Sequence, residues 1–116
     1  MIVAVDFDGT LHDGEYPQIG EIMPGAAKAM QALHDDGHTI IIWSCRAGDR
    51  LNEMLDWLDA EEIPYDYVNE HASEVIETFH SDSRKVYADV YIDDHNIGGL
   101  PSWHRIYRMI SNQSTL

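Results

Sequence analysis

The stretch Ile2-Val3-Ala4-Val5-Asp6-Phe7-Asp8-Gly9-Thr10 decides how the rest of the chain is interpreted. Its first four residues form a short, uninterrupted apolar run, which is typical of a parallel strand buried on both faces. Two aspartates follow, and the second stands in an Asp-Gly pair, an ordinary turn signal. The stretch therefore predicts a buried strand that carries acidic side chains at its carboxyl end.

Apolar runs and helical patterns alternate along the whole chain. Because strands that alternate with helices build βα units, we expect an α/β fold with a mainly parallel sheet between two helical layers, in a single domain over residues 1–116. The further strands are expected over residues 38–43, 65–69 and 87–92, and the helices over residues 24–36, 51–58, 72–80 and 101–110.

The composition is strongly acidic. The 116 residues include 21 Asp and Glu against 7 Lys and Arg, which gives a formal net charge of −14. Such a surface repels nucleic acids and anionic membranes, because both are bound mainly by Lys and Arg. A solvated surface, adaptation to salt and a metal-rich site all remain open as reasons for the acidity.

Other features favour a soluble, cytoplasmic protein. Cys45 is the single cysteine, which excludes an intramolecular disulfide framework, and we expect it to be a small buried residue. The longest purely apolar run, Ile40–Trp43, is far shorter than the roughly 20 residues of a membrane span. The first residues lack the basic start and the cleavage site of a signal peptide.

Chemically useful side chains stand at the ends of three expected strands. Asp6 and Asp8 follow the first strand, Ser44-Cys45-Arg46 follow the second, and Asp93-Asp94 follow the strand near residue 90, which Lys85 precedes. Because parallel α/β sheets bind ligands outside the carboxyl ends of their strands, we expect these residues to converge.

Four clustered carboxylates need a cation, since like charges a few ångströms apart disfavour one another's ionisation. Oxygen ligands without a nearby Cys/His pair favour Mg²⁺ over Zn²⁺. A lysine opposite the metal supplies a second positive pole, and a dianionic phosphoryl group fits between the two. The sequence therefore predicts a phosphoryl site that is built without a Gly-rich phosphate loop.

These motifs resemble those of the haloacid dehalogenase-like (HAD) hydrolase superfamily. Asp6-Phe7-Asp8-Gly9-Thr10 resembles its motif I, D-x-D-G-T, and Ser44 resembles motif II. Lys85 resembles motif III and Ile92-Asp93-Asp94 resembles motif IV, so the likeness spans residues 1–94. The resemblance implies a Rossmann-like (HAD-like) fold. It also implies a Mg²⁺-dependent phosphomonoester hydrolase, because the second aspartate of motif I marks the phosphatases and phosphomutases of the superfamily.

The resemblance implies a role for each motif residue. Asp6 would attack phosphorus and form an aspartyl-phosphate, and Asp8 would protonate the leaving group and then activate water. Ser44 would hydrogen-bond the phosphoryl oxygens, and Lys85 would neutralise their charge. Thr10 is grouped with these phosphoryl-binding residues and is also expected to orient Asp8.

The metal ligands follow from the same resemblance. Mg²⁺ would be bound by the Asp6 carboxylate, the Asp8 backbone carbonyl and the Asp93 carboxylate. Asp94 would either bind the ion through water or fix Lys85 in place. The resemblance therefore places one cation at the meeting point of motifs I and IV.

The sequence leaves more than one role open for several basic side chains near the motifs. Lys85 directly follows Arg84, and we favour Lys85 as the phosphoryl ligand because lysine acts as a point charge to phosphate. Arg46 would either bind the phosphoryl group or pair with surface acids. His12 and His95 stand just past motifs I and IV, and we expect both at the solvated surface.

The two places where members of the superfamily insert a cap domain are short here. Residues 11–23 offer a flap at most, and residues 70–84 already contain an expected helix. Capless relatives act on large substrates in an open cleft or gain a lid from a neighbouring subunit. We expect a small phosphorylated substrate, no nucleic acid, no membrane, and a homo-oligomer wherever a lid is needed.

Two other classes of protein fit parts of the pattern. A phospho-acceptor signalling domain also combines strand-end acids, Mg²⁺, a hydroxyl and a lysine, but its acid pair follows the first strand, the reverse of the order here. A catalytically silent HAD-like interaction module would share the fold without the chemistry, and the intact acids argue against it. On their own, Asp6 and Asp8 would indicate only a turn after a strand.

Overall fold

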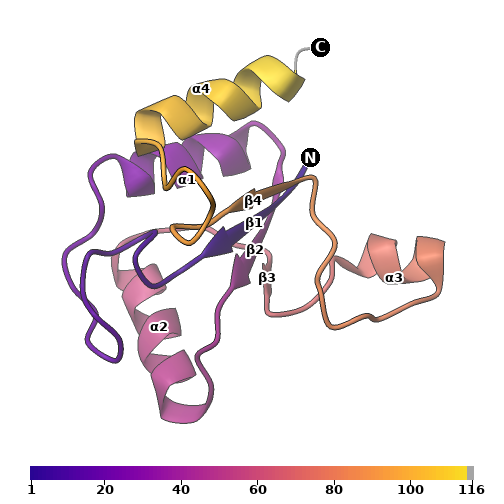
Figure 1. Ribbon diagram of the computed structural model, residues 1–116. Coiled ribbons are helices and arrows are strands. Elements are labelled where there is room, and N and C mark those ends of the chain that lie inside the picture. Colours follow the sequence, from indigo (N-terminus) through magenta and orange to yellow (C-terminus); the bar gives the residue numbers. More distant parts are fainter. Residues whose placement is uncertain (115–116) are drawn as a thin grey trace.

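The chain folds into four parallel strands and four helices over residues 1–114, the part that this computed structural model describes (Figure 1). In chain order the elements are β1 (Ile2–Asp6), α1 (Ala26–Asp35), β2 (Thr39–Trp43), α2 (Gly48–Ala60), β3 (Tyr67–Val68), α3 (Ser73–Phe79), β4 (Val90–Ile92) and α4 (Trp103–Ser114). The strands stand in the sheet in the order β3-β2-β1-β4.

The register of the strands brings chemically useful residues to one edge of the sheet. Asp6, the last residue of β1, pairs with the last residue of β2, so Ser44 lies just beyond the same edge. On the other side of β1, Val5 pairs with Ile92, and Asp93 therefore comes level with Asp6. Because both pairings are parallel, the carboxyl ends of β1, β2 and β4 meet in one place.

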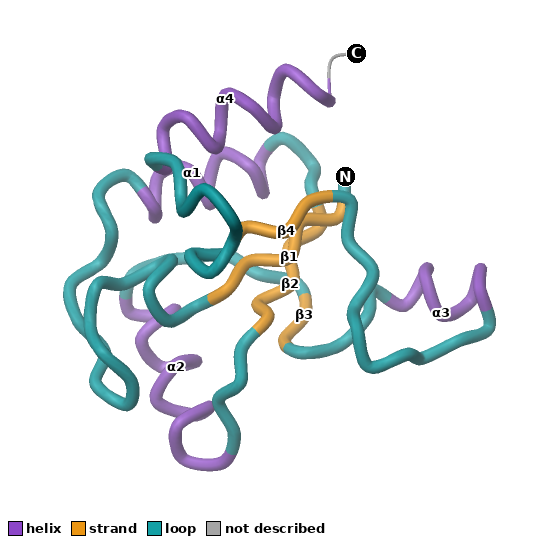
Figure 2. Tube along the Cα trace, viewed as in Figure 1, coloured by secondary structure: helices purple, strands orange, loops and turns teal. Residues whose placement is uncertain are grey.

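Alternate residues of β1 face two different hydrophobic clusters, because successive side chains of a strand point to opposite faces of the sheet. Val3 and Val5 belong to the larger cluster, together with buried residues of α1, α2 and α4. Ile2 and Ala4 belong to the smaller cluster, together with Val75 of α3 and buried residues of the segment before β4. The molecule thus has three layers, in which α1 and α4 lie side by side (Figure 2).

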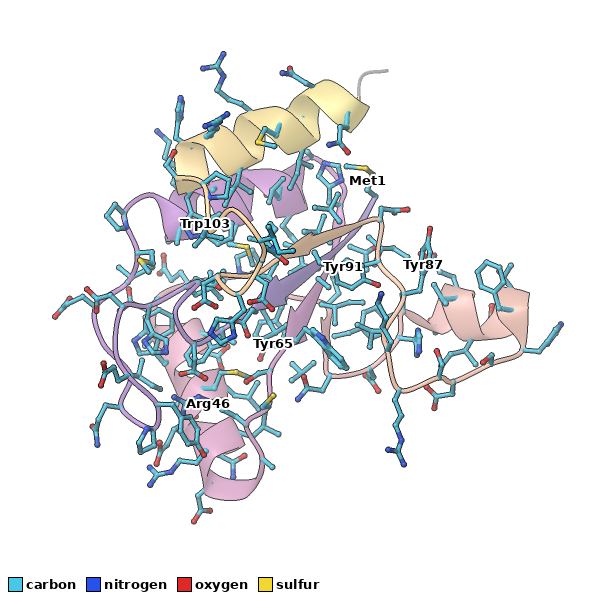
Figure 3. The ribbon with its side chains drawn as sticks, in the orientation of Figure 1. Met1, Arg46, Tyr65, Tyr87, Tyr91 and Trp103 are labelled. Carbon is cyan, nitrogen blue, oxygen red and sulfur yellow. The ribbon has the colours of Figure 1, made fainter. Side chains whose placement is uncertain are left out.

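A buried hydrogen bond joins α4 to the stretch that follows β1. The indole Nε1 of Trp103 donates a hydrogen bond of 2.9 Å to the backbone carbonyl oxygen of Thr10, and the Trp103 side chain lies inside the larger cluster (Figure 3). A polar group buried there needs a partner, since leaving it unpaired costs free energy. The contact fixes the backbone just after the two motif I aspartates.

The expected fold class is confirmed. The sheet is parallel, helices or their connections cover both of its faces, and residues 1–114 contain no cap domain. The four helices stand where the sequence predicts them, to within about four residues at their ends. Among the described helices, none is both long and apolar enough to cross a bilayer.

Two strands are shorter than the sequence predicts. The strand expected over residues 65–69 covers only Tyr67–Val68, and the strand expected over residues 87–92 covers only Val90–Ile92. The backbone N–H groups of residues 87 and 88 donate to the side chains of His71 and a tyrosine of β4. Those N–H groups are therefore not available to a neighbouring strand.

Candidate active site

Three strand ends contribute to one cavity of about 650 Å³. Asp6 ends β1, Ser44 follows β2 and Asp93 follows β4, and Asp8 reaches the same cavity from the turn after β1. The structure thus brings together four of the residues that the sequence singled out. The rest of the lining is Tyr16, Trp43, Cys45 and His95.

Asp6 lies in a crowded group of acids. Its Oδ2 is 3.1 Å from the Thr10 hydroxyl, which is also 3.3 Å from Oδ1 of Asp94. Burial, together with the nearby negative charge of Asp93, raises the pKa of Asp6 to about 7. Within residues 1–114, Asp6 has no ion-pair partner.

The structure corrects two expectations for Thr10, that it orients Asp8 and that it binds the phosphoryl group. Its side chain is fully buried, its hydroxyl accepts a hydrogen bond of 3.0 Å from the backbone N–H of Asp94, and the same hydroxyl contacts Asp6. Thr10 therefore joins motif I to motif IV and orients Asp6, rather than Asp8. Because it is buried, it is not placed to touch a phosphoryl group.

The acids at this edge have the chemistry of a site for a hard cation. Asp93, Asp94 and His95 offer ligand atoms within 4.8 Å of one another, and Asp6 lines the same cavity as Asp93. Carboxylate oxygens are the ligands that Mg²⁺ prefers, and a cation would relieve the repulsion that raises the pKa of Asp6. These residues therefore fit the metal that the sequence predicts.

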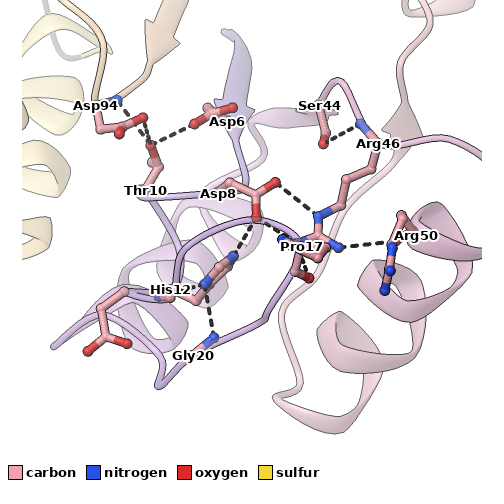
Figure 4. Close-up of polar contacts among 12 residues, drawn as sticks. Asp6, Asp8, Thr10, His12, Pro17, Gly20, Ser44, Arg46, Arg50 and Asp94 are labelled. Carbon is pink, nitrogen blue, oxygen red and sulfur yellow. Dashed lines mark hydrogen bonds and ion pairs between the residues drawn. The ribbon is translucent and has the colours of Figure 1, made fainter.

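Asp8 has the opposite electrostatic surroundings (Figure 4). Arg46 donates to both of its carboxylate oxygens, from Nε to Oδ2 at 2.9 Å and from Nη2 to Oδ1 at 2.7 Å. Nε2 of His12 lies 2.8 Å from the same Oδ1. Burial alone would raise the pKa of Asp8, but the hydrogen bonds from Arg46 and His12 prevail and lower it.

Several neighbours hold the Arg46 side chain in its contact with Asp8. The residue is 3% exposed, and its guanidinium lies 5.2 Å from the ring centre of Phe7 and 5.0 Å from that of Tyr16. Its Nη2 also donates to the backbone oxygen of Pro17 at 3.1 Å. The sequence left Arg46 open between phosphoryl binding and pairing with surface acids, and in this structure its donors hold Asp8, an acid that lines the cavity.

The sequence did not identify His12 as a site residue. We expected it at the solvated surface, but it is fully buried, with both ring nitrogens hydrogen-bonded. Its partners are Asp8 and the backbone of a loop that folds back over it (Figure 4). No local pattern marks this residue, because only the folded loop brings its partners together. His95, by contrast, has a side chain that is 90% exposed, as expected.

Ser44 and Cys45 lie at the end of β2 and line the cavity. The Ser44 hydroxyl oxygen accepts a hydrogen bond of 3.1 Å from the backbone N–H of Arg46, and the Ser44 backbone N–H donates to Asn69 at 2.7 Å. These contacts leave the hydroxyl proton available to a ligand. Cys45 is exposed, so the expectation that it is buried is wrong.

Lys85 lies in a second cavity of about 300 Å³ that adjoins the first, since Asp6, Trp43 and Asp93 line both. The residue is exposed, and its Nζ lies 5.2 Å from the ring centre of Tyr91. The neighbouring arginine of residue 84 lines neither of these two cavities. This placement favours Lys85 over Arg84, because Lys85 shares a cavity with Asp6 and Arg84 does not.

Comparisons with known proteins give one informative match. Neither the protein-family models nor the curated proteins contain a match to this sequence. A solved structure described as a conserved protein from Bacteroides thetaiotaomicron is 41% identical, with a TM-score of 0.86. The match covers 97% of this chain and 91% of that chain. At this identity and coverage, the chain belongs to the same family as the conserved Bacteroides thetaiotaomicron protein.

Proposed function

We propose that the protein is a Mg²⁺-dependent phosphomonoester hydrolase of the HAD-like type, which works through an aspartyl-phosphate on Asp6. One observation carries this proposal: Asp6, Asp8, Ser44 and Asp93 line a single cavity, and Lys85 borders the adjoining one. A nucleophile, a second carboxyl group, a hydroxyl and an ammonium group are thereby grouped around the space that a phosphoryl group would occupy.

In the first step, a carboxylate oxygen of Asp6 forms a bond to phosphorus. The bond between phosphorus and the leaving oxygen breaks, and its electron pair stays on that oxygen, which takes a proton from the Asp8 carboxyl group. In the free protein, Arg46 and His12 keep the pKa of Asp8 low. A dianionic phosphoryl group beside Asp8 supplies like charge, which favours the protonated form that this step requires.

In the second step, Asp8 acts as a base. Its carboxylate takes a proton from water as the water oxygen forms a bond to phosphorus, and the bond between phosphorus and Asp6 breaks. Phosphate leaves, and Asp6 and Asp8 return to their starting forms, with Asp8 protonated. The hydrogen bonds from Arg46 and His12 favour the ionised form of Asp8, which is the form that accepts this proton at the start of the step.

The remaining side chains bind and neutralise the phosphoryl group. Asp6, Asp93 and Asp94 would hold Mg²⁺ together with the Asp8 backbone carbonyl, and the bound ion would offset the charge of the phosphoryl oxygens. The Ser44 hydroxyl has a proton to donate to one of these oxygens. Lys85 supplies a positive charge from the adjoining cavity.

The cavity suits a small phosphorylated substrate. Its volume of about 650 Å³ lies within the range of small-molecule sites, and two aromatic rings, those of Tyr16 and Trp43, offer apolar surface to a leaving group. The net charge of −14 disfavours polyanions such as nucleic acids. Within this proposal the protein works in the cytoplasm, and a closed form of the site takes its lid from a second copy of the chain.

The proposal is tested with purified protein and 4-nitrophenyl phosphate. We expect hydrolysis that requires Mg²⁺ and stops with a chelator, and we expect Asp6→Asn to lower the rate by roughly 10³-fold or more. The matched control is Asp35→Asn, an exposed aspartate of α1 outside both cavities, which should keep full activity. Equal rates for the Asp6 and Asp35 variants would exclude Asp6 as the nucleophile.

A further inference from the structure

His12 connects the Asp8 carboxylate to a loop that we call the flap, residues 13–20. Its Nδ1 accepts hydrogen bonds from the backbone N–H groups of Gly14 at 3.0 Å and Gly20 at 3.1 Å, and its Nε2 lies 2.8 Å from Asp8 Oδ1. The His12 side chain itself is fully buried (Figure 4). The flap and the carboxylate thus share one imidazole ring.

These contacts determine which ring nitrogen carries the proton. A backbone N–H group can only donate, so Nδ1 of His12 acts as the acceptor. In a neutral imidazole the proton then lies on Nε2, which donates it to Asp8. The two amides from Gly14 and Gly20 therefore select the tautomer that holds the carboxylate.

Ring packing sets the direction of this donor. The imidazole ring centre lies 4.7 Å from that of Phe7 and 6.0 Å from that of Trp57, and Phe7 is itself fully buried. A buried ring packed against two aromatic neighbours has little room to turn. Nε2 of His12 is consequently aimed at Asp8 before any substrate arrives.

The donors on Asp8 are unevenly divided between its oxygens. Oδ1 receives hydrogen bonds from His12 and from Nη2 of Arg46, whereas Oδ2 receives one, from Nε of Arg46. Each carboxylate oxygen can accept about two hydrogen bonds, so Oδ1 is saturated and Oδ2 has capacity for one more. Oδ2 is therefore the oxygen that remains able to carry a proton to a substrate.

The flap can make these contacts only in a compact form. A Cβ atom on Gly20 would overlap the backbone of Gly14 and the side chain of Asp13, so the two glycines approach more closely than other residues could. Arg46 adds a second link, since the Nη2 that holds Asp8 also donates to the backbone oxygen of Pro17 in the flap. Both side chains that hold Asp8 thus also hold the flap.

We propose that His12 is a positioning residue for the acid–base carboxylate Asp8, and that the flap, through its hydrogen bonds to the His12 ring, holds the orientation in which Asp8 gives its proton to the leaving group. The inference rests on the proposed phosphomonoesterase function. Asp8 Oδ2 gives its proton to the leaving oxygen while Oδ1 stays anchored to His12 and Arg46. Loss of the anchor lets the carboxyl group turn away from the leaving oxygen, which slows only those reactions that need the proton.

The test compares two phosphate esters on the same variants. 4-Nitrophenolate leaves without a proton, whereas an alkoxide needs one, so the two esters separate acid catalysis from the rest of the reaction. We expect His12→Phe to lower kcat/KM for an alkyl phosphate by roughly tenfold or more and that for 4-nitrophenyl phosphate by about twofold or less. His12→Gln, which restores an N–H donor, should recover most of the alkyl phosphate rate.

A flap variant tests the same coupling without touching His12 or Asp8. Gly20→Ala displaces the backbone amides that bind Nδ1 of His12. This variant should show the same selective loss of kcat/KM on the alkyl phosphate. It therefore also tests the positioning role if His12→Phe does not fold. The matched control is Glu15→Ala, an exposed flap residue, which should leave both rates unchanged.

The outcomes separate the two proposals. Equal losses on both esters for the His12 and Gly20 variants would overturn the positioning role and leave the hydrolase function standing. A wild-type protein that hydrolyses neither ester in Mg²⁺ would overturn the hydrolase function, and the role of His12 with it. A selective loss that His12→Gln recovers supports both.

Discussion

Two loops border the two adjoining cavities, the one after β1 through Tyr16 and the one before β4 through Lys85, and each contacts a buried histidine. In the loop after β1, Nδ1 of His12 accepts from two flap amides and Nε2 contacts the Asp8 carboxylate. In the segment before β4, Nδ1 of His71 accepts from the backbone N–H of Tyr87 at 3.2 Å, and its Nε2 donates to the backbone oxygen of Ser83 at 2.8 Å. The two histidines have the same tautomer and a similar depth, but different partners.

The difference lies in what each histidine holds in place. His12 fixes a side chain, because one of its hydrogen bonds ends on the carboxylate of Asp8, the proposed acid–base group. His71 hydrogen-bonds backbone groups on either side of Lys85, and its Nε2 lies 3.9 Å from a carboxylate oxygen of Asp82. The Lys85 side chain is exposed and, within residues 1–114, makes no ion pair. A carboxyl group that transfers a proton must be oriented toward the oxygen that receives it, whereas a lysine ammonium group acts as a point charge and needs no such orientation. The two loops therefore supply different degrees of preorganisation to the proposed site.

Among substitutions in the two loops, the largest loss of activity is expected at Lys85. If the segment before β4 serves to deliver its charge, Lys85→Ala should lower kcat/KM for both phosphate esters by roughly 10²-fold or more, since transition-state charge loses its partner. Arg84→Ala is the matched control, because Arg84 lines neither cavity, and it should change kcat/KM by about twofold or less. Similar losses for the two variants would contradict the assignment.

A smaller effect is expected at His71. His71→Phe leaves the backbone oxygen of Ser83 and the N–H of Tyr87 unpaired in a buried place, so the free energy of unfolding should fall by about 2 kcal/mol in urea denaturation. Its kcat/KM should fall by the same factor on alkyl and 4-nitrophenyl phosphates, because charge delivery matters for both. A leaving-group preference like the one expected for His12→Phe would show that the two loops do not differ in this way.

The smallest effect concerns the pH dependence of stability at Asp6. Its pKa rises from 3.8 to about 7 on folding, so the folded protein binds this proton more tightly than the unfolded chain does. The stabilisation from protonated Asp6 is complete below about pH 4 and is lost as the pH rises through 7. In a chelator at pH 8, Asp6→Asn should therefore be more stable than the wild type, by about 1 kcal/mol after solvent screening.

The measurement is urea denaturation of both proteins in a chelator between pH 4 and pH 8. The wild type should lose more of its free energy of unfolding over this range than Asp6→Asn, and the gap should close or reverse with saturating Mg²⁺, since the ion removes the repulsion. Parallel pH profiles for the two proteins would show that Asp6 carries no raised pKa.

The central strands could be predicted because each is a run of consecutive apolar residues, the pattern of a strand buried on both faces. Ile2–Asp6 and Thr39–Trp43 form the middle of the sheet, where both faces and both edges are covered. The outer strands were predicted too long, because their ends depend on partners far along the chain. Tyr87 is a good strand residue by propensity, yet its N–H group donates to the buried His71, which no local pattern could reveal.

The candidate site also contains residues that could be predicted from the local sequence and residues that could not. Asp6, Ser44 and Asp93 could be placed together from the sequence, since strand ends and a parallel order suffice to bring them to one edge. Arg46 and His12 could not be assigned to Asp8, because their aim depends on how the flap folds back over the turn. Side chains at strand ends can be located from the local sequence, whereas the hydrogen bonds that orient them and shift their pKa values depend on how the loops fold.

The central claim is that Asp6 becomes phosphorylated, and trapping the intermediate tests it most directly. In Asp8→Asn, 4-nitrophenolate still leaves without an acid, but water lacks its base, so the aspartyl-phosphate should accumulate. Borohydride reduces an acyl phosphate to an alcohol, and peptide mass spectrometry then identifies the residue that was modified. The account predicts homoserine at position 6 in amounts that match the released 4-nitrophenolate. Release of 4-nitrophenolate with Asp6 left unmodified would contradict it.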